Sequence, residues 1–428
     1  MNRRNDPTAE HTVGTRTDRL TVVDEIFLHK HRGLGLPAVM QGVWRTDDHI
    51  DAPLLISLHD ALSQGPLGRR VVRSKIPGAR PHFEPTTVSY PVRYTNDPLG
   101  DGKILDWADA QAEVDIDPSH APGWALAAAP VAGGGTVISL VCSHVLTDAR
   151  GLIDAVTDAL AGKGIATEDD GSSAASDSDL RDALHLTGRV VKGLRNVRFG
   201  SSGEAPPPPH IVRSKARTAL VDVDAAAWDE AAHAAGGSSN SLFLAITTGI
   251  ATRAGLTLPM RIAIPVDVRE SGTASNGVMI TELVADEGDT AATLRAKASA
   301  AYRTPREAAP YGIPDEILQL MPDRVAAHRA RQSAERELMC SNIGRTPPLF
   351  DAFGPHPSRG VAMRAMHPGL DTLHVSTPTK LSSYLNRNRG TYSLALVALD
   401  EDAFPDAATL RRYVDDEMGA RGLEPAHW

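Results

Sequence analysis

Two polar stretches near the middle of the chain divide it into two halves of similar length. Thr167–Asp179 reads TEDDGSSAASDSD, is acidic and rich in Ser, and lacks periodicity, which predicts a mobile loop. Gly200–His210 reads GSSGEAPPPPH, and its four prolines favour an extended spacer. A short helical pattern at Asp179–Arg198 lies between them. Because 428 residues are long for one core, we predict two lobes joined by this segment. The predicted bounds are 20–165 for the N-lobe, 166–210 for the mobile linker and crossover, and 211–428 for the C-lobe.

Both halves mix strand and helix patterns. In the first half, 124–142 predicts two strands joined at Gly133–Gly135, followed by a helix whose apolar residues recur at helical spacing up to Gly162. The second half shows a helix at 239–254 that ends near Gly255, two strands and a further helix. Its late segment TYSLALVALD alternates as a half-exposed strand does. We therefore predict an α+β or α/β fold in each half.

Composition excludes several classes of function. The net charge is −9 and Lys and Arg are scattered, so no nucleic-acid partner is expected. The start of the chain is polar, and no stretch approaches the ~18–20 apolar residues that span a bilayer. The two cysteines, Cys142 and Cys340, lack any metal-ligand spacing and predict buried apolar positions in a reducing compartment. We expect a cytoplasmic protein with no membrane span and no metal.

One histidine stands out by its context. His144 and Asp148 form an H-x-x-x-D pattern, but with 16 histidines chance supplies about one such match, and His367–Asp371 is a second one in a Pro-Gly turn. His144 differs because it follows an apolar strand run and precedes a helix, a junction where loops carry chemistry. It is either a general base or an ordinary loop histidine. Asp148 either holds the loop or caps the following helix.

The segments around this pattern resemble the CoA-dependent acyltransferase superfamily. The segment at His144 is similar to its H-H-x-x-x-D-G signature, and wax ester synthase/diacylglycerol acyltransferases, related to condensation domains, give the nearest likeness. Six further segments match in order along most of the chain. These are TVVDEIFL at 21–28 (D-x-x-F), HAPGWALAAAP at 120–130 (P-L-W), 238–255 (N-D-x-x-x-A), 260–284 (V-P-V-x-x-R … G-N), 338–350 (S-N-x-x-G-P) and 381–406 (S-Y-x-G … D).

The resemblance implies two chloramphenicol-acetyltransferase-like lobes, each a mixed sheet flanked by helices, that form a V with a tunnel at the interface. His144 would act as general base for acyl transfer without a covalent enzyme intermediate. Asp148 would pair with Arg269 and tie the lobes together, with Gly151 supporting the loop. We expect structural roles for Trp124, in core packing, and for Asn240, as a helix cap. The residues expected to contact substrate are Ser143, Thr147, Arg150, Asn240, Ser341 and Asn342.

The implied reaction moves an acyl group from acyl-CoA to a hydroxyl acceptor, a small-molecule or lipid alcohol, with no tightly bound cofactor. Two alternatives stay open: a condensation-like enzyme that takes its acyl group from an acyl carrier protein and forms an amide, and a catalytically silent binding relative. Ser143 replaces the first histidine of the signature. The glycine is displaced to Gly151, giving D-A-R-G, which places Arg150 near the tunnel and favours a specialised acceptor.

Overall fold

The computed structural model describes most of the chain. The predicted acidic loop up to residue 174 and the proline-rich spacer at 200–210 lie outside the described residues, as does Asp371. The described residues are 19–100, 102–120, 122–162, 175–194, 215–269, 275–303, 315–323, 325, 336–370 and 379–428.

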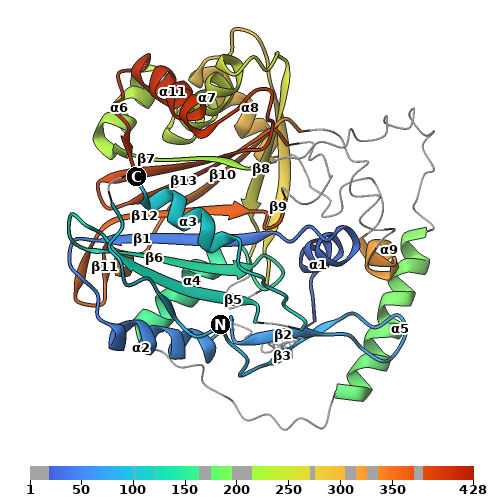
Figure 1. The fold of residues 1–428 in the computed structure, drawn as a ribbon. Helices are drawn as coiled ribbons and strands as arrows, with labels where there is room; N and C mark the ends of the chain where they lie inside the picture. The colour runs from blue at the N-terminus through green and yellow to red at the C-terminus, as the bar shows by residue number, and fades with distance from the viewer. Residues whose placement is uncertain are drawn as a thin grey trace, which may run out of the picture.

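Two large sheets form the two lobes (Figure 1). The six-stranded sheet has the order β11-β12-β1-β6-β5-β4, and the seven-stranded sheet has the order β15-β7-β14-β13-β10-β8-β9. A small hairpin, β2-β3, stands apart. The strands are β1 Val39–Thr46, β2 Arg69–Val72, β3 His82–Pro85, β4 Arg93–Tyr94, β5 Trp124–Pro130, β6 Thr136–Ser143, β7 Arg217–Asp224, β8 Met260–Asp267, β9 Val278–Ala285, β10 Leu338–Arg345, β11 Ala352–Phe353, β12 His356–Met366, β13 Leu381–Asn388, β14 Thr391–Ala398 and β15 Ala426–His427.

Helices cover the outer faces of these sheets. In Figure 1, α6, α7, α8 and α11 lie above the seven-stranded sheet, and α2 lies at the opposite end of the molecule. The mixed, two-lobed architecture predicted from the sequence is confirmed. The helices are α1 Val22–Leu34, α2 Ala52–Ser63, α3 Ile104–Ala112, α4 Ala149–Leu160, α5 Ala175–Leu194, α6 Ala225–Ala234, α7 Ser239–Arg253, α8 Ala291–Arg303, α9 Asp315–Leu320 and α11 Ala407–Gly419, with a 3-10 turn at Pro348–Asp351.

The predicted strand pair before His144 is confirmed as the hairpin β5-β6. Gly135 has a φ of +84°, and a Cβ there would lie 1.9 Å from the Thr46 carbonyl oxygen, so this turn requires glycine. The prediction that TYSLALVALD is half exposed is wrong. β14 is buried on both faces because β7 and β13 flank it and helices and β12 pack on its two sides. The apparent alternation reflects side-chain size rather than exposure.

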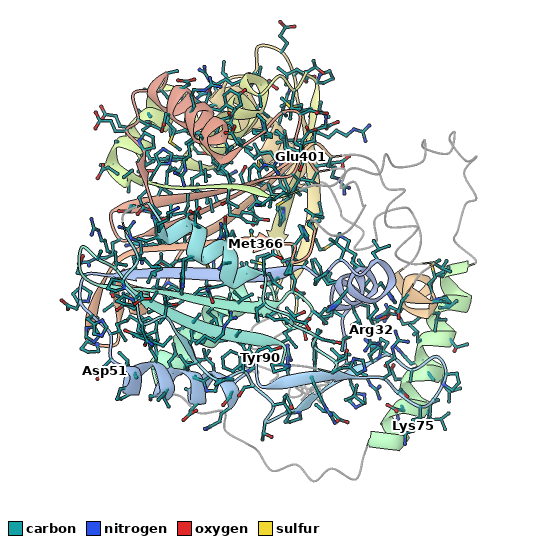
Figure 2. The ribbon with its side chains drawn as sticks, viewed as in Figure 1. Arg32, Asp51, Lys75, Tyr90, Met366 and Glu401 are labelled. Carbon is teal, nitrogen blue, oxygen red and sulfur yellow. The ribbon has the colours of Figure 1, made fainter. Side chains whose placement is uncertain are left out.

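Strand β12 joins the two halves of the chain. It comes from the second half, yet it pairs antiparallel with β1 in the six-stranded sheet and also packs against β13 and β14. Figure 2 shows its last residue, Met366, between the two lobes. A division of the chain at one linker therefore does not describe which strands share a sheet.

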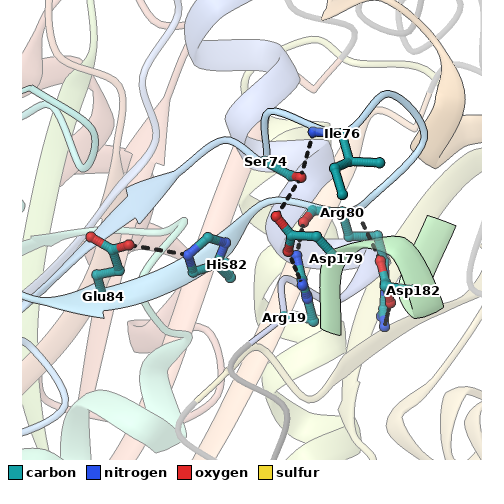
Figure 3. Close-up of polar contacts among 8 residues, drawn as sticks. All are labelled: Arg19, Ser74, Ile76, Arg80, His82, Glu84, Asp179 and Asp182. Carbon is teal, nitrogen blue, oxygen red and sulfur yellow. Dashed lines mark hydrogen bonds and ion pairs between the residues drawn. The ribbon is translucent and has the colours of Figure 1, made fainter. Parts of the chain in front are cut away.

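Helix α5 occupies part of the predicted linker, starting four residues before the expected Asp179. Its acidic side chains hold it on the N-lobe (Figure 3). Asp179 pairs with Arg19 and accepts a hydrogen bond from Ser74 Oγ at 2.6 Å, while Asp182 binds Arg80 Nη2 at 2.6 Å. This part of the linker is thus docked against the N-lobe. Among the described residues, no helix has the length and apolar character needed to cross a membrane.

A buried arginine on β12 gives the first prediction. Arg364 is fully buried, its Nε donates to Gln41 Oε1 at 2.8 Å, and its Nη2 lies 2.6 Å from Asp109 Oδ1. We expect Arg364→Met to lower the free energy of unfolding by about 3 kcal/mol, because Gln41 and Asp109 lose their partner. Arg359→Met, at an exposed position on the same strand, should change it little. Equal denaturation midpoints for the two variants would contradict this role.

Candidate active site

The end of the six-stranded sheet positions His144. Ser143, the last residue of β6, pairs with Val39 of β1, which pairs on its other side with Met366 of β12. One residue further, the His144 backbone N–H donates to the Ala38 carbonyl at 2.8 Å. The backbone of His144 is therefore fixed at the C-terminal end of β6, an interior strand of the sheet, where the chain turns toward α4.

Hydrogen bonds to Asn276 define the tautomer of His144. The Asn276 amide Nδ2 donates to Asp24 Oδ1 at 2.6 Å and to the His144 carbonyl at 2.8 Å. The amide oxygen therefore faces His144 Nδ1, 3.1 Å away, and accepts a proton from it. Nε2 is left with its lone pair, which is what a general base requires.

Asp24 holds this arrangement from helix α1. It is fully buried and forms the capping box of α1 with Thr21, while its Oδ1 accepts hydrogen bonds from both the backbone and the side chain of Asn276. Burial raises the pKa of Asp24, and these donors lower it. The sequence TVVDEIFL thus caps a helix and, through Asn276, orients the imidazole.

The imidazole lies against an aromatic ring. Phe27 stacks on His144 with ring centroids 3.7 Å apart and an interplanar angle of 14°. His144 is half-buried, and its removal from bulk water lowers its pKa below the ordinary value of 6.5, against the nearby charge of Asp148. The neutral form therefore predominates at pH 7.

Asp148 combines the two roles that the sequence left open. Its Oδ1 accepts from Gly151 N at 3.0 Å, so it is the N-cap of α4. The same carboxylate pairs with Arg269 and accepts from Gly277 N at 2.8 Å, both from the segment that follows β8. The side chains of Asp148 and Arg269 are 3% and 7% exposed, so this is a buried tie between lobes. None of these hydrogen bonds joins Asp148 to the His144 ring, whose partner is Asn276.

Space around the tie explains the displaced glycine. A Cβ on Gly151 would lie 1.9 Å from Thr147 Oγ1 and 3.1 Å from Arg269 Nη2. Any side chain at this position would push the arginine away from Asp148. Because its backbone N–H already donates to Asp148, Gly151 does not supply a free amide for an oxyanion.

Several predicted substrate contacts line a single cavity. The cavity has a volume of about 660 Å³ and lies where α4 meets α7, α8, β8 and β10. Its residues include Arg150, Asn240, Ser341 and Asn342, four of the residues for which we expect substrate contacts, and Asp148 forms part of its wall. His144, Ser143 and Thr147 do not line it. Of the H-x-x-x-D pattern, Asp148 therefore reaches this cavity and His144 does not.

Other predicted positions have structural roles. The predicted cap at Asn240 is wrong, because Ser238 caps α7 in a capping box with Ser241. Asn240 lies at the cavity instead, where its side chain bonds Tyr302 and Asn342. Trp124 is 1% exposed and belongs to the core.

Both cysteines are buried, and burial raises the pKa of each thiol to about 12. At neutral pH these thiols stay protonated and are poor nucleophiles, since the thiolate is the reactive form. Each belongs to a sheet strand, Cys142 to β6 and Cys340 to β10. The sequence-based interpretation of both as apolar core residues agrees with these positions.

Sequence reasoning missed the residues that orient the His144 imidazole. Asp24 and Phe27 were noticed only as parts of a motif, and Asn276 only as one letter of a loop. Asn276 follows β8, 132 residues from His144, and no periodicity connects the two positions. The available signal was the Ser-Asn-Gly triplet after Arg269, because an amide beside a glycine in a loop has the freedom to reach a distant partner.

The fold is that of the CoA-dependent acyltransferases, shared by condensation domains and wax ester synthases. In sequence, no family model matches the chain and no curated protein matches it. The likeness is therefore one of structure.

Three solved structures illustrate it. A condensation domain of the CDA synthetase aligns with a TM-score of 0.60 at 13% identity, covering 95% of this chain and 96% of that one. The wax ester synthase/diacylglycerol acyltransferase from Marinobacter aquaeolei VT8 aligns with a TM-score of 0.55 at 14% identity, covering 94% and 100%. A starter condensation domain of rhizomide synthetase, a variant in complex with C8-CoA, gives 0.53 at 14% identity, covering 95% of each chain.

The buried tie gives the second prediction. Asp148→Asn and Arg269→Met should each lower the free energy of unfolding by about 3–5 kcal/mol, because each leaves a buried charge without its partner. The exposed pair Arg70–Glu84 serves as the matched control, and Glu84→Gln should cost little. Urea denaturation of the single and double variants measures the coupling. Additive losses would show that the two residues act separately.

Proposed function

We propose that this protein is an acyltransferase that moves an acyl group from a thioester to a hydroxyl acceptor, with His144 as general base. The observation that carries the proposal is the imidazole itself. Asn276 fixes it as the Nδ1–H tautomer, and partial burial keeps it neutral, so that Nε2 is ready to accept a proton. The fold it shares with acyl-transferring enzymes supports the same reaction class.

The proposed chemistry needs no covalent enzyme intermediate. Nε2 removes the proton of the acceptor hydroxyl as its oxygen attacks the thioester carbonyl, and a tetrahedral intermediate forms. When this collapses, the carbon–sulfur bond breaks and the imidazolium returns the proton to the departing thiolate. Two hydrogen bonds keep the ring in place throughout: one from His144 Nδ1 to Asn276 Oδ1, and one from the His144 backbone N–H to the Ala38 carbonyl. Exclusion of water by the lobes protects the thioester from hydrolysis.

We assign the donor to the cavity beside the tie. Arg150, Arg295 and Arg303 line it together with Asp267, while its other carboxylate, Asp148, is neutralised by Arg269. A net positive lining suits the phosphates of coenzyme A, since arginine binds phosphate oxygens well. Ser341 and Asn342, on β10 in the same wall, remain our candidates for contacts with the donor.

A carrier-protein donor is the alternative. The condensation domain of the CDA synthetase shares this fold over nearly its whole length, and the resemblance to condensation domains is the reason to consider an acyl group delivered on a protein. A phosphopantetheine arm carries the same thioester and one phosphate, so the cavity suits both donors. Comparing free acyl-CoA with an acylated carrier protein in one assay separates the two.

The third prediction tests the base. Wild-type protein incubated with acyl-CoA and a panel of alcohols should release free thiol and yield the ester by mass. His144→Ala should lower kcat by about 10²–10⁴-fold, the usual contribution of a general base. Cys142→Ala and Cys340→Ala serve as controls and should retain turnover, because neither thiol ionises at neutral pH. Undiminished turnover by His144→Ala would refute the assignment.

The fourth prediction concerns pH. A base must be unprotonated, so kcat/KM falls as pH drops through the pKa of His144. Because that pKa is lowered, the midpoint of the acid limb should lie below 6.5 and activity should be level from pH 7 to 8. The pKa of His367 is about 4, so this second histidine does not titrate in that range. A midpoint above 7 would contradict a desolvated base.

A further inference from the structure

A second histidine flanks the same strand end as His144. Because Met366, Val39 and Ser143 are in register across three strands, His367 and His144 follow on opposite sides of the residues that enter β1. His367 Nδ1 donates to the Pro37 carbonyl at 3.3 Å, since a carbonyl can only accept. Its turn was expected from the sequence, and Leu370 N closes it onto the His367 carbonyl at 3.3 Å. The hydrogen bonds of both histidines to the adjacent residues Pro37 and Ala38 were not expected.

A lysine from α1 reaches the same place. Lys30 lies one helical turn after Phe27, with its Nζ 5.8 Å from the centre of the Phe27 ring that stacks on His144. The Leu36 N–H donates to the Lys30 carbonyl at 3.3 Å, and the next residue, Pro37, accepts from His367 Nδ1, so Lys30 and His367 contact the same short segment. Burial lowers the pKa of both histidines, and the positive charge of Lys30 adds to this effect. Within the ranges that the structure describes, no carboxylate pairs with Lys30. The neighbouring cation, Arg336, is itself bound to Glu282 at 2.9 Å.

We propose that Lys30, with His367 beside it, forms a subsite for a carboxylate on the acyl acceptor, so that the acceptor is a short hydroxy acid rather than a long-chain alcohol. The inference rests on the proposed acyl transfer. It assigns a function to two residues that the reaction itself does not use.

Three observations favour this ligand. A half-buried ammonium without an acidic partner is costly, and a bound anion offsets that cost. The subsite offers a single positive charge, which suits a monoanionic carboxylate, whereas the arginine-lined cavity suits phosphates. Phe27 links the two groups, since its ring stacks on His144 at 3.7 Å and its centre is 5.8 Å from Lys30 Nζ, which suits an acceptor that carries its carboxylate and its hydroxyl on a short skeleton. The cavity assigned to the donor is not lined by Lys30, His144 or His367, so the two subsites share none of these residues.

The test compares each acid with its own methyl ester. Lactate, 3-hydroxybutyrate and 4-hydroxybenzoate are assayed with acetyl-CoA and octanoyl-CoA by thiol release and product mass. Wild-type protein should prefer the best acid over its ester by about 10-fold or more in kcat/KM. Lys30→Met should abolish that preference through KM for the acid, with KM for acyl-CoA unchanged. Lys75→Met, an exposed lysine at the outer edge of the molecule (Figure 2), is the matched control and should keep it.

Three results would overturn the subsite. The first is a wild-type preference for the ester, and the second is an acid preference that survives Lys30→Met. The third is a Lys30→Met variant that loses only a preference for succinyl-CoA over butyryl-CoA, which would assign the carboxylate to the acyl donor. Absence of thiol release with every acceptor would instead count against the proposed function. Calorimetric titration of wild-type and Lys30→Met protein with the acids and esters then decides the subsite separately. Binding of an acid by the wild type alone supports it, and equal or no binding refutes it.

Discussion

The buried contact of Asp148 with Arg269 is the interaction on which the site depends. The Asp148 carboxylate caps helix α4, which follows β6. It also accepts a hydrogen bond from the Gly277 N–H and neutralises Arg269 from the other lobe. Burial of two charges is expensive unless their hydrogen bonds are satisfied. Here the carboxylate has partners on both oxygens, so the cost is offset only when the two lobes keep this relative position.

That relative position also sets the orientation of His144. Asn276 directly precedes Gly277, so the segment held by Asp148 is the one that delivers an amide to His144. Asp24 fixes the other side of the amide from helix α1. The aspartate of the H-x-x-x-D pattern thus acts on the histidine indirectly, through the loop that it anchors. This explains how Asp148 affects the orientation of His144 although its carboxylate points toward Arg269 and Gly277.

Much of the fold was predictable because its signals are local. The β5-β6 hairpin, helix α4 and helix α7 follow from periodicity, caps and glycines within each segment. The place of β12 was not predictable, since pairing across halves leaves no periodic trace. The same limit applied to the site: His144 and Asp148 were found from one stretch, whereas Asn276 and Lys30 reach it from separate elements. The turn predicted at His367 is confirmed, whereas the contact of its imidazole with Pro37, 330 residues away, leaves no local signal.

The departures from the family signature acquire physical reasons in this structure. Ser143 ends a buried strand and its Oγ accepts from Val145 N at 3.3 Å, so it supports the turn that follows β6. Gly151 is required where it stands because Thr147 and Arg269 fill the space that a Cβ would need. With glycine at this place in α4, Arg150 is free to line the cavity next to β10. The altered motif therefore keeps both His144 and the Asp148–Arg269 tie, and it adds a positive charge to the cavity that we propose as the donor site.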